Sequence, residues 1–108
     1  MTSERMRRVD EAVREVLSDV LTHEVKDPRV GFVTVTDVKT SPDLSHARVY
    51  VSVLGDAEAV SASLEGLRSA QGFLQGRIGS ELRLKHTPTL EFVFDDTVRR
   101  ADRINRLT

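Results

Sequence analysis

Few residues in this sequence have the types and spacings that support catalysis or metal binding. Ser41, Asp43 and His46 lie close together, but they occupy a turn-rich stretch and no G-x-S-x-G nucleophile motif is present. There are no cysteines, and the three histidines fall in three separate segments, so no thiolate site or histidine pair is indicated. Asp95 and Asp96 are adjacent, which in a strand directs them to opposite faces. We therefore expect no catalysis, no metal and no cofactor.

One tetrapeptide matches a nucleic-acid signature. Gly76-Arg77-Ile78-Gly79 is a G-x-x-G, the sequence with which KH domains clamp a nucleotide backbone. In that fold the tetrapeptide separates two helices, and too few residues follow it before Pro88 to form the second helix. A break at Ala70-Gln71-Gly72 leaves residues 73–85 for a helix of ordinary length. We therefore interpret the literal G-x-x-G as part of a helix.

Charge is unevenly distributed along the chain. Sixteen basic residues face seventeen acidic ones, so any nucleic-acid surface must be local. Most of the basic residues are arginines, which form forked hydrogen bonds to phosphate. Segments 66–86 and 98–108 are net basic, whereas 9–27 and 43–65 are net acidic. This segregation is compatible with one nucleic-acid face, although such runs also occur as solvated faces without a ligand. The phenylalanines occupy core-like positions, so base stacking is not indicated.

Hydrophobic periodicity divides the chain into six elements that would carry these residues. Three segments have apolar residues at helical spacing, and three alternate or are rich in β-branched residues. In chain order they are a helix over about 4–25, strands over 32–38 and 47–54, helices over about 56–69 and 73–85, and a strand over 89–95. This order predicts an α+β fold in which helices pack on one face of a three-stranded sheet, as in the type II KH fold.

Length and composition are those of one soluble domain. The chain has 108 residues, of which 39% are hydrophobic and 31% charged. No apolar run approaches the roughly 20 residues of a membrane span, and no secretory signal follows the first residues. We expect a single cytoplasmic domain over 1–108, with a core at about 4–95. The segment 97–108 would be a short C-terminal extension, either helical or flexible.

Six short stretches carry a further signal through their order and spacing. They are Lys26-Asp27-Pro28-Arg29, Ser41-Pro42-Asp43-Leu44, Ala47-Arg48-Val49-Tyr50-Val51, Ala70-Gln71-Gly72-Phe73-Leu74, Leu82-Arg83-Leu84-Lys85 and Pro88-Thr89-Leu90-Glu91-Phe92. Together they resemble the ribosome-binding factor A family of bacterial small-subunit assembly proteins, from about Arg8 to Leu107. The resemblance implies a KH-like domain in which an A-x-G helix kink at Ala70, Gln71 and Gly72 replaces the G-x-x-G loop. The family commonly has a basic residue where this chain has Gln75.

The resemblance also implies a function and a set of partners. It implies binding to the free 30S ribosomal subunit, a role late in 16S rRNA maturation near the 5′ end, and a link to growth in the cold. Such a factor is non-catalytic and works by binding immature and mature subunits with different affinities. We expect it to be a monomer that does not bind a membrane. Two alternatives stay open. A general KH-type binder would prefer naked single-stranded RNA, and a protein-interaction module would bind with little dependence on salt.

The expected RNA contacts are basic side chains around the predicted kink and at the start of the chain. The candidates are Arg29, Arg68, Arg77, Arg83 and Lys85, with Arg5, Arg7 and Arg8 as a flexible supplement. Ala70, Gln71 and Gly72 would shape the kink and would not bind RNA through their side chains.

Overall fold

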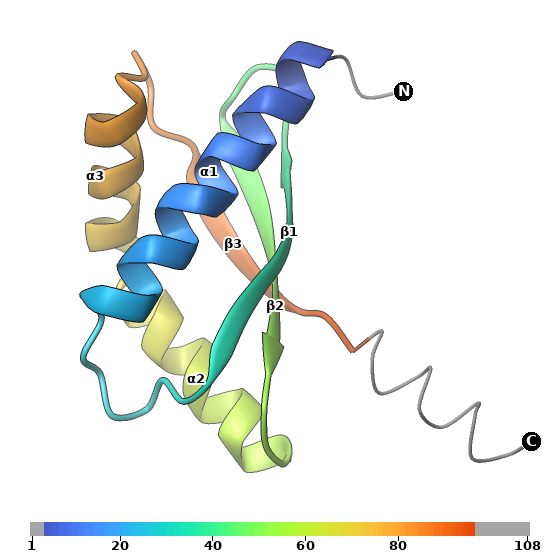
Figure 1. The fold of residues 1–108 in the computed structure, drawn as a ribbon, viewed down its shortest axis with the longest axis vertical. Helices are drawn as coiled ribbons and strands as arrows, with labels where there is room; N and C mark the ends of the chain where they lie inside the picture. Colours follow the sequence, from blue (N-terminus) through green and yellow to red (C-terminus); the bar gives the residue numbers. More distant parts are fainter. Residues whose placement is uncertain (1–3, 97–108) are drawn as a thin grey trace, which may run out of the picture.

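The computed structural model describes residues 4–96, so the predicted extension at 97–108 lies outside the described residues. The elements are α1 (Glu4–His23), β1 (Val33–Thr40), β2 (His46–Val53), α2 (Ala57–Ser69), α3 (Gln71–Leu82) and β3 (Thr89–Phe94). Their order and types are those predicted, and only the boundaries differ by a few residues. The three helices lie on one face of the sheet (Figure 1). Among the described residues, no helix has the length and apolar composition required to cross a bilayer.

The sheet has the strand order β1-β2-β3. β1 pairs with β2 as an antiparallel hairpin, and β2 pairs with β3 in parallel, so α2 and α3 form the crossover between them. The start of β1 therefore meets the ends of β2 and β3 at one end of the sheet. The opposite end carries the β1–β2 turn, the α3–β3 loop and the first turns of α1 (Figure 1).

The core lies between the inner face of the sheet and the helices. Alternation along β2 buries one side of the strand, as its sequence predicts. The helices α1 and α3 each contribute a row of fully buried apolar side chains, and α2 contributes Leu67. The buried residues with the lowest exposure are Val13, Leu17, Val49, Val51, Leu67, Leu74 and Ile78. Because this packing uses only the inner face, the outer face of the sheet has no helix on it among residues 4–96 (Figure 1).

A single residue separates α2 from α3. Ala70 has φ −87° and ψ 1°, and its N–H donates to the carbonyl oxygens of Gly66 and Leu67 at 3.1 Å. Its own carbonyl oxygen accepts the N–H of Leu74 at 2.9 Å, so α3 begins at once. The break is therefore narrower than the predicted kink, because Gln71 and Gly72 already belong to the first turn of α3.

Two buried or half-buried glycines allow close packing of the helices. A Cβ at Gly66 would lie 2.6 Å from Val30 Cγ2, so α2 can approach the loop after α1 only without a side chain there. A Cβ at Gly79 would lie 2.5 Å from Thr87 Oγ1. The literal G-x-x-G at residues 76–79 thus lies inside α3, as interpreted from the sequence, and its second glycine serves packing.

Candidate nucleic-acid interface

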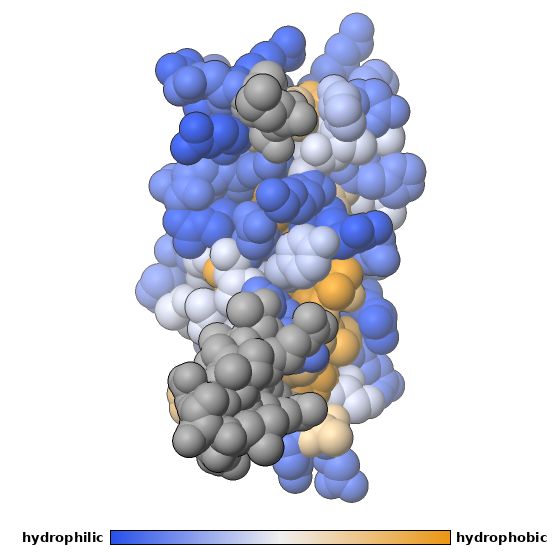
Figure 2. All heavy atoms as spheres, turned by 90° about the vertical axis from the view of Figure 1, so that its right-hand side faces the viewer, coloured by the Kyte–Doolittle hydropathy of each residue, from blue (hydrophilic) through white to orange (hydrophobic). Residues whose placement is uncertain are grey.

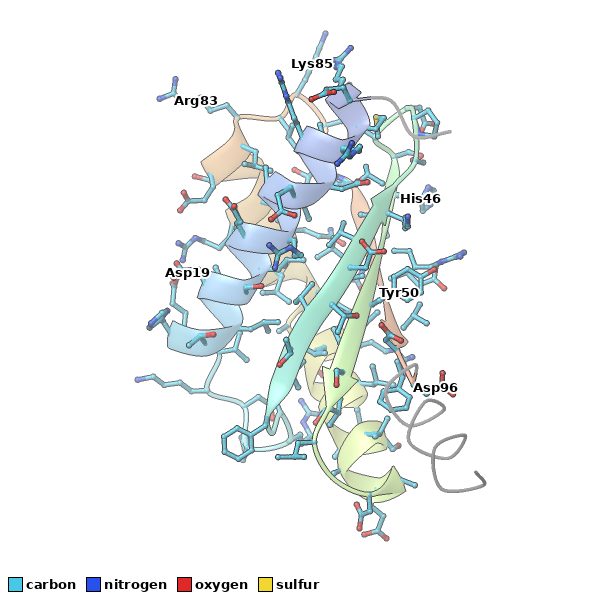
Figure 3. All side chains as sticks on the ribbon, turned by 45° about the vertical axis from the view of Figure 1, so that its right-hand side comes forward. Asp19, His46, Tyr50, Arg83, Lys85 and Asp96 are labelled. Carbon is cyan, nitrogen blue, oxygen red and sulfur yellow. The ribbon has the colours of Figure 1, made fainter. Side chains whose placement is uncertain are left out.

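Four of the predicted RNA-contacting side chains gather at one end of the molecule. Arg5 and Arg8 lie in the first turns of α1, and Arg83 and Lys85 follow the end of α3. All four are exposed, and the start of α1 and the α3–β3 loop occupy the same end in two views (Figures 1 and 3). Arg83 and Lys85 point outward from that loop (Figure 3). We call these four residues the basic end. Arg5, Arg7 and Arg8 belong to a regular helix and not to a flexible arm.

The basic end keeps most of its positive charge available. Within the described part of the chain, Arg5, Arg83 and Lys85 take part in no salt bridge. Arg8 lies 3.8 Å from Glu4, and both side chains are more than three-quarters exposed, so this pair contributes little. Exposed cations without partners are the groups that an incoming phosphate can contact without first displacing a carboxylate.

Arg83 also has an unusual backbone conformation. It ends α3 with φ 51° and ψ 43°, in the left-handed region, and the N–H of Leu84 donates to the Gly79 carbonyl oxygen at 3.2 Å. Helices often end in this way, but glycine usually occupies the position because a Cβ is unfavourable there. The conformation turns the chain away from the helix, and the Arg83 side chain extends outward at this end of the molecule (Figure 3).

Arg29 is held by carboxylates and is not part of the basic end. Its guanidinium donates to both carboxylate oxygens of Asp27, with the shortest contact at 2.6 Å, and lies 3.4 Å from Glu65 of α2. These hydrogen bonds lower the pKa of Asp27 to about 2. The Arg29 carbonyl oxygen also accepts a hydrogen bond from Ser63 at 3.4 Å. Arg29 therefore fastens the loop after α1 to α2.

Arg77 has a similar structural role. Its guanidinium pairs with Glu24, just beyond α1, and with Glu81 one turn along α3 at 3.1 Å. Both carboxylates raise the pKa of Arg77. The pair with Glu24 joins α3 to the end of α1, so a phosphate would have to compete with two carboxylates for this side chain.

Arg68 is exposed and stands apart from the basic end. It lies in the last turn of α2, two residues before Ala70, and forms no ion pair with any residue in 4–96. Beside the break, a Cβ at Gly72 would meet nothing within 4 Å, and Phe73 is 49% exposed. The surface at the break is therefore open. The placement of Phe73 in the core was wrong, because Phe73 lies on the exposed side of α3 while its neighbour Leu74 is fully buried.

The Ser41–Asp43–His46 cluster builds the β1–β2 turn. Asp43 Oδ1 accepts hydrogen bonds from the Ser41 and Ser45 hydroxyls, each at 2.7 Å, and from the Ser45 N–H at 3.0 Å. These donors lower the pKa of Asp43 to about 2. His46 Nδ1 contacts the Ser45 hydroxyl at 2.9 Å and not the Ser41 hydroxyl, so no Ser–His pair for nucleophile activation is formed. Within residues 4–96, no three metal-ligating side chains form a metal site.

We expect Asp43→Asn to make the thermal stability of the fold depend less on pH in the acidic range. The folded pKa of about 2 is below the ordinary 3.8, so ionised Asp43 stabilises the fold above about pH 4, and this contribution disappears as the pH falls toward 2. The variant should therefore have a lower Tm than the parent chain at pH 7, and the difference should shrink between pH 5 and pH 2. A Tm difference that is constant over this range would contradict the role of these hydrogen bonds.

Comparison with known proteins identifies the family. The sequence profile of ribosome-binding factor A matches residues 5–108. A ribosome-binding factor A from Natranaerobius thermophilus is 46% identical over 107 residues, which cover 99% of this chain and 82% of the relative. The chain belongs to the ribosome-binding factor A family. This confirms the resemblance in the sequence.

Solved structures of ribosome-binding factor A share the fold. The crystal structure of the factor from Thermus thermophilus has a TM-score of 0.73 at 25% identity, covering 82% of this chain and 93% of that one. A homology model of the Thermus thermophilus factor, fitted into the cryo-EM map of its 30S complex, has a TM-score of 0.66 at 27% identity, covering 80% and 90%. The predicted α+β, KH-like order of elements is therefore confirmed.

Gln75 of this ribosome-binding factor A chain has a role that the sequence did not reveal. Its side-chain oxygen accepts the N–H of Leu90 at 3.0 Å and the side-chain amide of Gln71 at 2.9 Å. Gln75 thus ties α3 to the edge of β3. One signal was available, because Gln75 lies beside Leu74 and Ile78 of the buried stripe, where a polar group needs a partner.

We expect Gln75→Leu to destabilise the fold by about 1–3 kcal/mol, because it leaves the half-buried Leu90 N–H without an acceptor. Gln71→Leu is the matched control, since it removes one side-chain donor and leaves the bond to Leu90 in place. Urea denaturation would measure both variants. Equal losses would show that the bond to Leu90 does not matter.

Proposed function

We propose that this protein binds the free 30S ribosomal subunit and assists a late step in the maturation of 16S rRNA near its 5′ end. The observation that carries the proposal is the basic end, where Arg5, Arg8, Arg83 and Lys85 are exposed together. The 30S complex of the Thermus thermophilus factor, which has the same fold, supports the choice of target. A role in the cold and a cytoplasmic location are part of the same proposal.

The proposed binding is local and electrostatic. The formal net charge of the chain is −1, so attraction to RNA cannot come from the molecule as a whole. The basic end would approach phosphates first, while acidic residues at the other end, such as Asp95 and Asp96, would be repelled. Arginine and lysine would contact backbone phosphates, which fix position without reading sequence. Specificity for one state of the subunit would then come from the shape of the rRNA.

The left-handed backbone conformation of Arg83 supports a functional role for its side chain. An L-residue with φ 51° is less stable there than glycine by roughly 1 kcal/mol. A functional residue commonly occupies a position whose conformation costs stability. We propose that Arg83 is a principal phosphate contact and that Lys85, two residues away, is its partner.

The proposed mechanism requires no catalysis and no cofactor. A monomeric binding protein shifts the folding equilibrium of rRNA only by binding one state more tightly than another. A hundredfold preference for the immature subunit corresponds to about 2.7 kcal/mol of coupling. Arg29 would contribute by holding the loop after α1 in place, and Arg77 by holding α3 in place. Arg68 would be a peripheral RNA contact beside the break.

Sedimentation of lysate through sucrose gradients at moderate and high salt tests the proposal. We expect the protein to migrate with free 30S subunits, to be absent from translating ribosomes, and to dissociate at high salt. Four phosphate contacts predict a loss of about tenfold in affinity for each doubling of salt. A protein that stays at the top of the gradient at both salts would contradict subunit binding. An affinity that does not change with salt concentration would favour a protein-interaction module. A preference for naked oligonucleotides would favour a general KH-type binder.

A further inference from the structure

An apolar cleft lies at the end of the sheet opposite to the basic end, where the outer face meets the ends of the strands. Phe32 and Leu54 are 80% and 76% exposed, although both are large apolar side chains. The Leu54 N–H donates to the Phe32 carbonyl oxygen at 3.1 Å, so the two residues are neighbours across the hairpin. With Phe94, Thr34, Ser52 and Asp95 they line a cleft of about 390 Å³. Figure 2 shows apolar residues gathered in the lower half of this side of the molecule.

The exposed Phe32 and Leu54 side chains form an apolar surface on which another segment can dock. Single exposed apolar residues are common, but adjacent large ones that line a cleft mark a contact with another segment or another molecule. The helices cannot supply this segment, because α1, α2 and α3 all pack on the inner face of the sheet (Figure 1). A segment that docks there must therefore come from outside residues 4–96.

We propose that residues 97–108 of this chain dock in the cleft formed by Phe32, Leu54 and Phe94. The chain leaves the sheet at the rim of this cleft, because Asp95 lines it and the Asp95 N–H donates to the Val51 carbonyl oxygen at 2.7 Å. Twelve residues in helical form would span about 18 Å. Three adjacent strands measure only about 10 Å from first to third, so the segment is long enough to cross the cleft.

The composition of residues 97–108 fits this surface. At 100° per residue, its apolar side chains occupy one half of a helix and its arginines lie mostly on the other half. The apolar residues are Val98, Ala101, Ile104 and Leu107, and the basic residues are Arg99, Arg100, Arg103 and Arg106. Docking would cover Phe32 and Leu54 with the apolar half and leave the arginines toward solvent. Asp95 and Asp96 stand at the N-terminal side of the segment, where negative charge favours a helix.

The proposed function does not use this cleft. The basic end lies at the opposite end of the sheet, so failure of either proposal leaves the other intact. A second copy of the chain, or a different protein with a basic apolar segment, could also cover the cleft. Cross-linking distinguishes these occupants from residues 97–108.

An engineered disulfide in the full chain tests the docking. The chain has no cysteine, so Ser52→Cys with Ala101→Cys introduces the only pair that can form within one molecule. Both substitutions keep the side chains small. The control pair is Asp19→Cys with Ala101→Cys, because Asp19 lies on α1 on the opposite side of the sheet (Figure 3). We expect mild oxidation to link the first pair within one molecule at least tenfold faster than the control, independently of protein concentration. Equal rates would overturn the proposal, and so would linked dimers, which would indicate a second copy.

A second measurement uses exposure of the cleft to an apolar dye. We expect Ile104→Ser with Leu107→Ser to increase dye binding several-fold, because the cover is weakened and the cleft opens. Arg103→Ser with Arg106→Ser shortens two side chains on the basic half and should leave dye binding as in the parent chain. Dye binding that is equal in all three proteins would overturn the proposal, and would indicate an unoccupied cleft that is free for another protein.

Discussion

Replacing Arg83 and Lys85 together by glutamate should abolish migration with 30S subunits. The double change alters the local charge by four units and converts two phosphate contacts into two repulsions, so we expect at least a hundredfold loss of affinity, or about 2.7 kcal/mol. Both side chains are exposed and without salt bridges in the described part of the chain, so Tm should change little. Sedimentation and thermal denaturation of the same preparation measure the two effects.

A matched charge reversal separates the basic end from overall charge. Lys26→Glu makes the same change as Lys85→Glu, but Lys26 is an exposed residue in the loop after α1, away from the basic end (Figure 1). We expect Lys85→Glu alone to weaken binding about tenfold or more and Lys26→Glu to weaken it only slightly. Equal losses would show that binding depends on net charge and would remove the basic end as the site.

The second large effect concerns stability. Gly66→Ala should destabilise the fold by about 1–3 kcal/mol, because its Cβ would lie 2.6 Å from Val30 Cγ2, 3.4 Å from Arg29 Cβ and 3.5 Å from the Val30 backbone nitrogen. The neighbouring loop cannot move freely, because Arg29 is held by Asp27 and Glu65. For a chain of this length the loss corresponds to a Tm lower by roughly 5–15 °C.

Gly76→Ala is the matched control for this prediction. Gly76 is also helical, but a Cβ there would meet nothing within 4 Å. The higher helix propensity of alanine should therefore stabilise the protein by up to about 1 kcal/mol. Opposite signs for the two glycines are the expected result of urea denaturation. A gain of stability in both variants would mean that the loop at Val30 can move to make room for the added Cβ.

The elements of this fold were predictable because local patterns determine them. Helical spacing in α1 and strict alternation in β2 are signals within a few residues, and the structure confirms both. The position of the helix break also followed from a length argument, since the G-x-x-G at 76–79 leaves too little chain for another helix. These inferences needed no knowledge of which elements touch.

The site was predicted less well because it depends on contacts between distant residues. Arg77 pairs with Glu24, which is 53 residues away, and Arg29 pairs with Glu65, which is 36 residues away. Charge counts along the chain treat these arginines like Arg83, although their guanidiniums are occupied. Phe32 was likewise expected in a core, but it lies just before β1 on the uncovered face. Only the packed structure separates a cation that holds two elements together from one that is available to a ligand.

The parallel pairing of β2 with β3 sets the order in which this protein can fold. His46 pairs with Thr89 and Val51 pairs with Phe94, so β3 joins its neighbour only after about 40 intervening residues have been made and folded into α2 and α3. The hairpin and α1 can form early, because their contacts are local. Until β3 arrives, β2 presents an unpaired edge, and Leu67, Leu74 and Ile78 lack the strand that completes their packing. On a translating ribosome, the three-stranded sheet is therefore completed only when β3 has emerged.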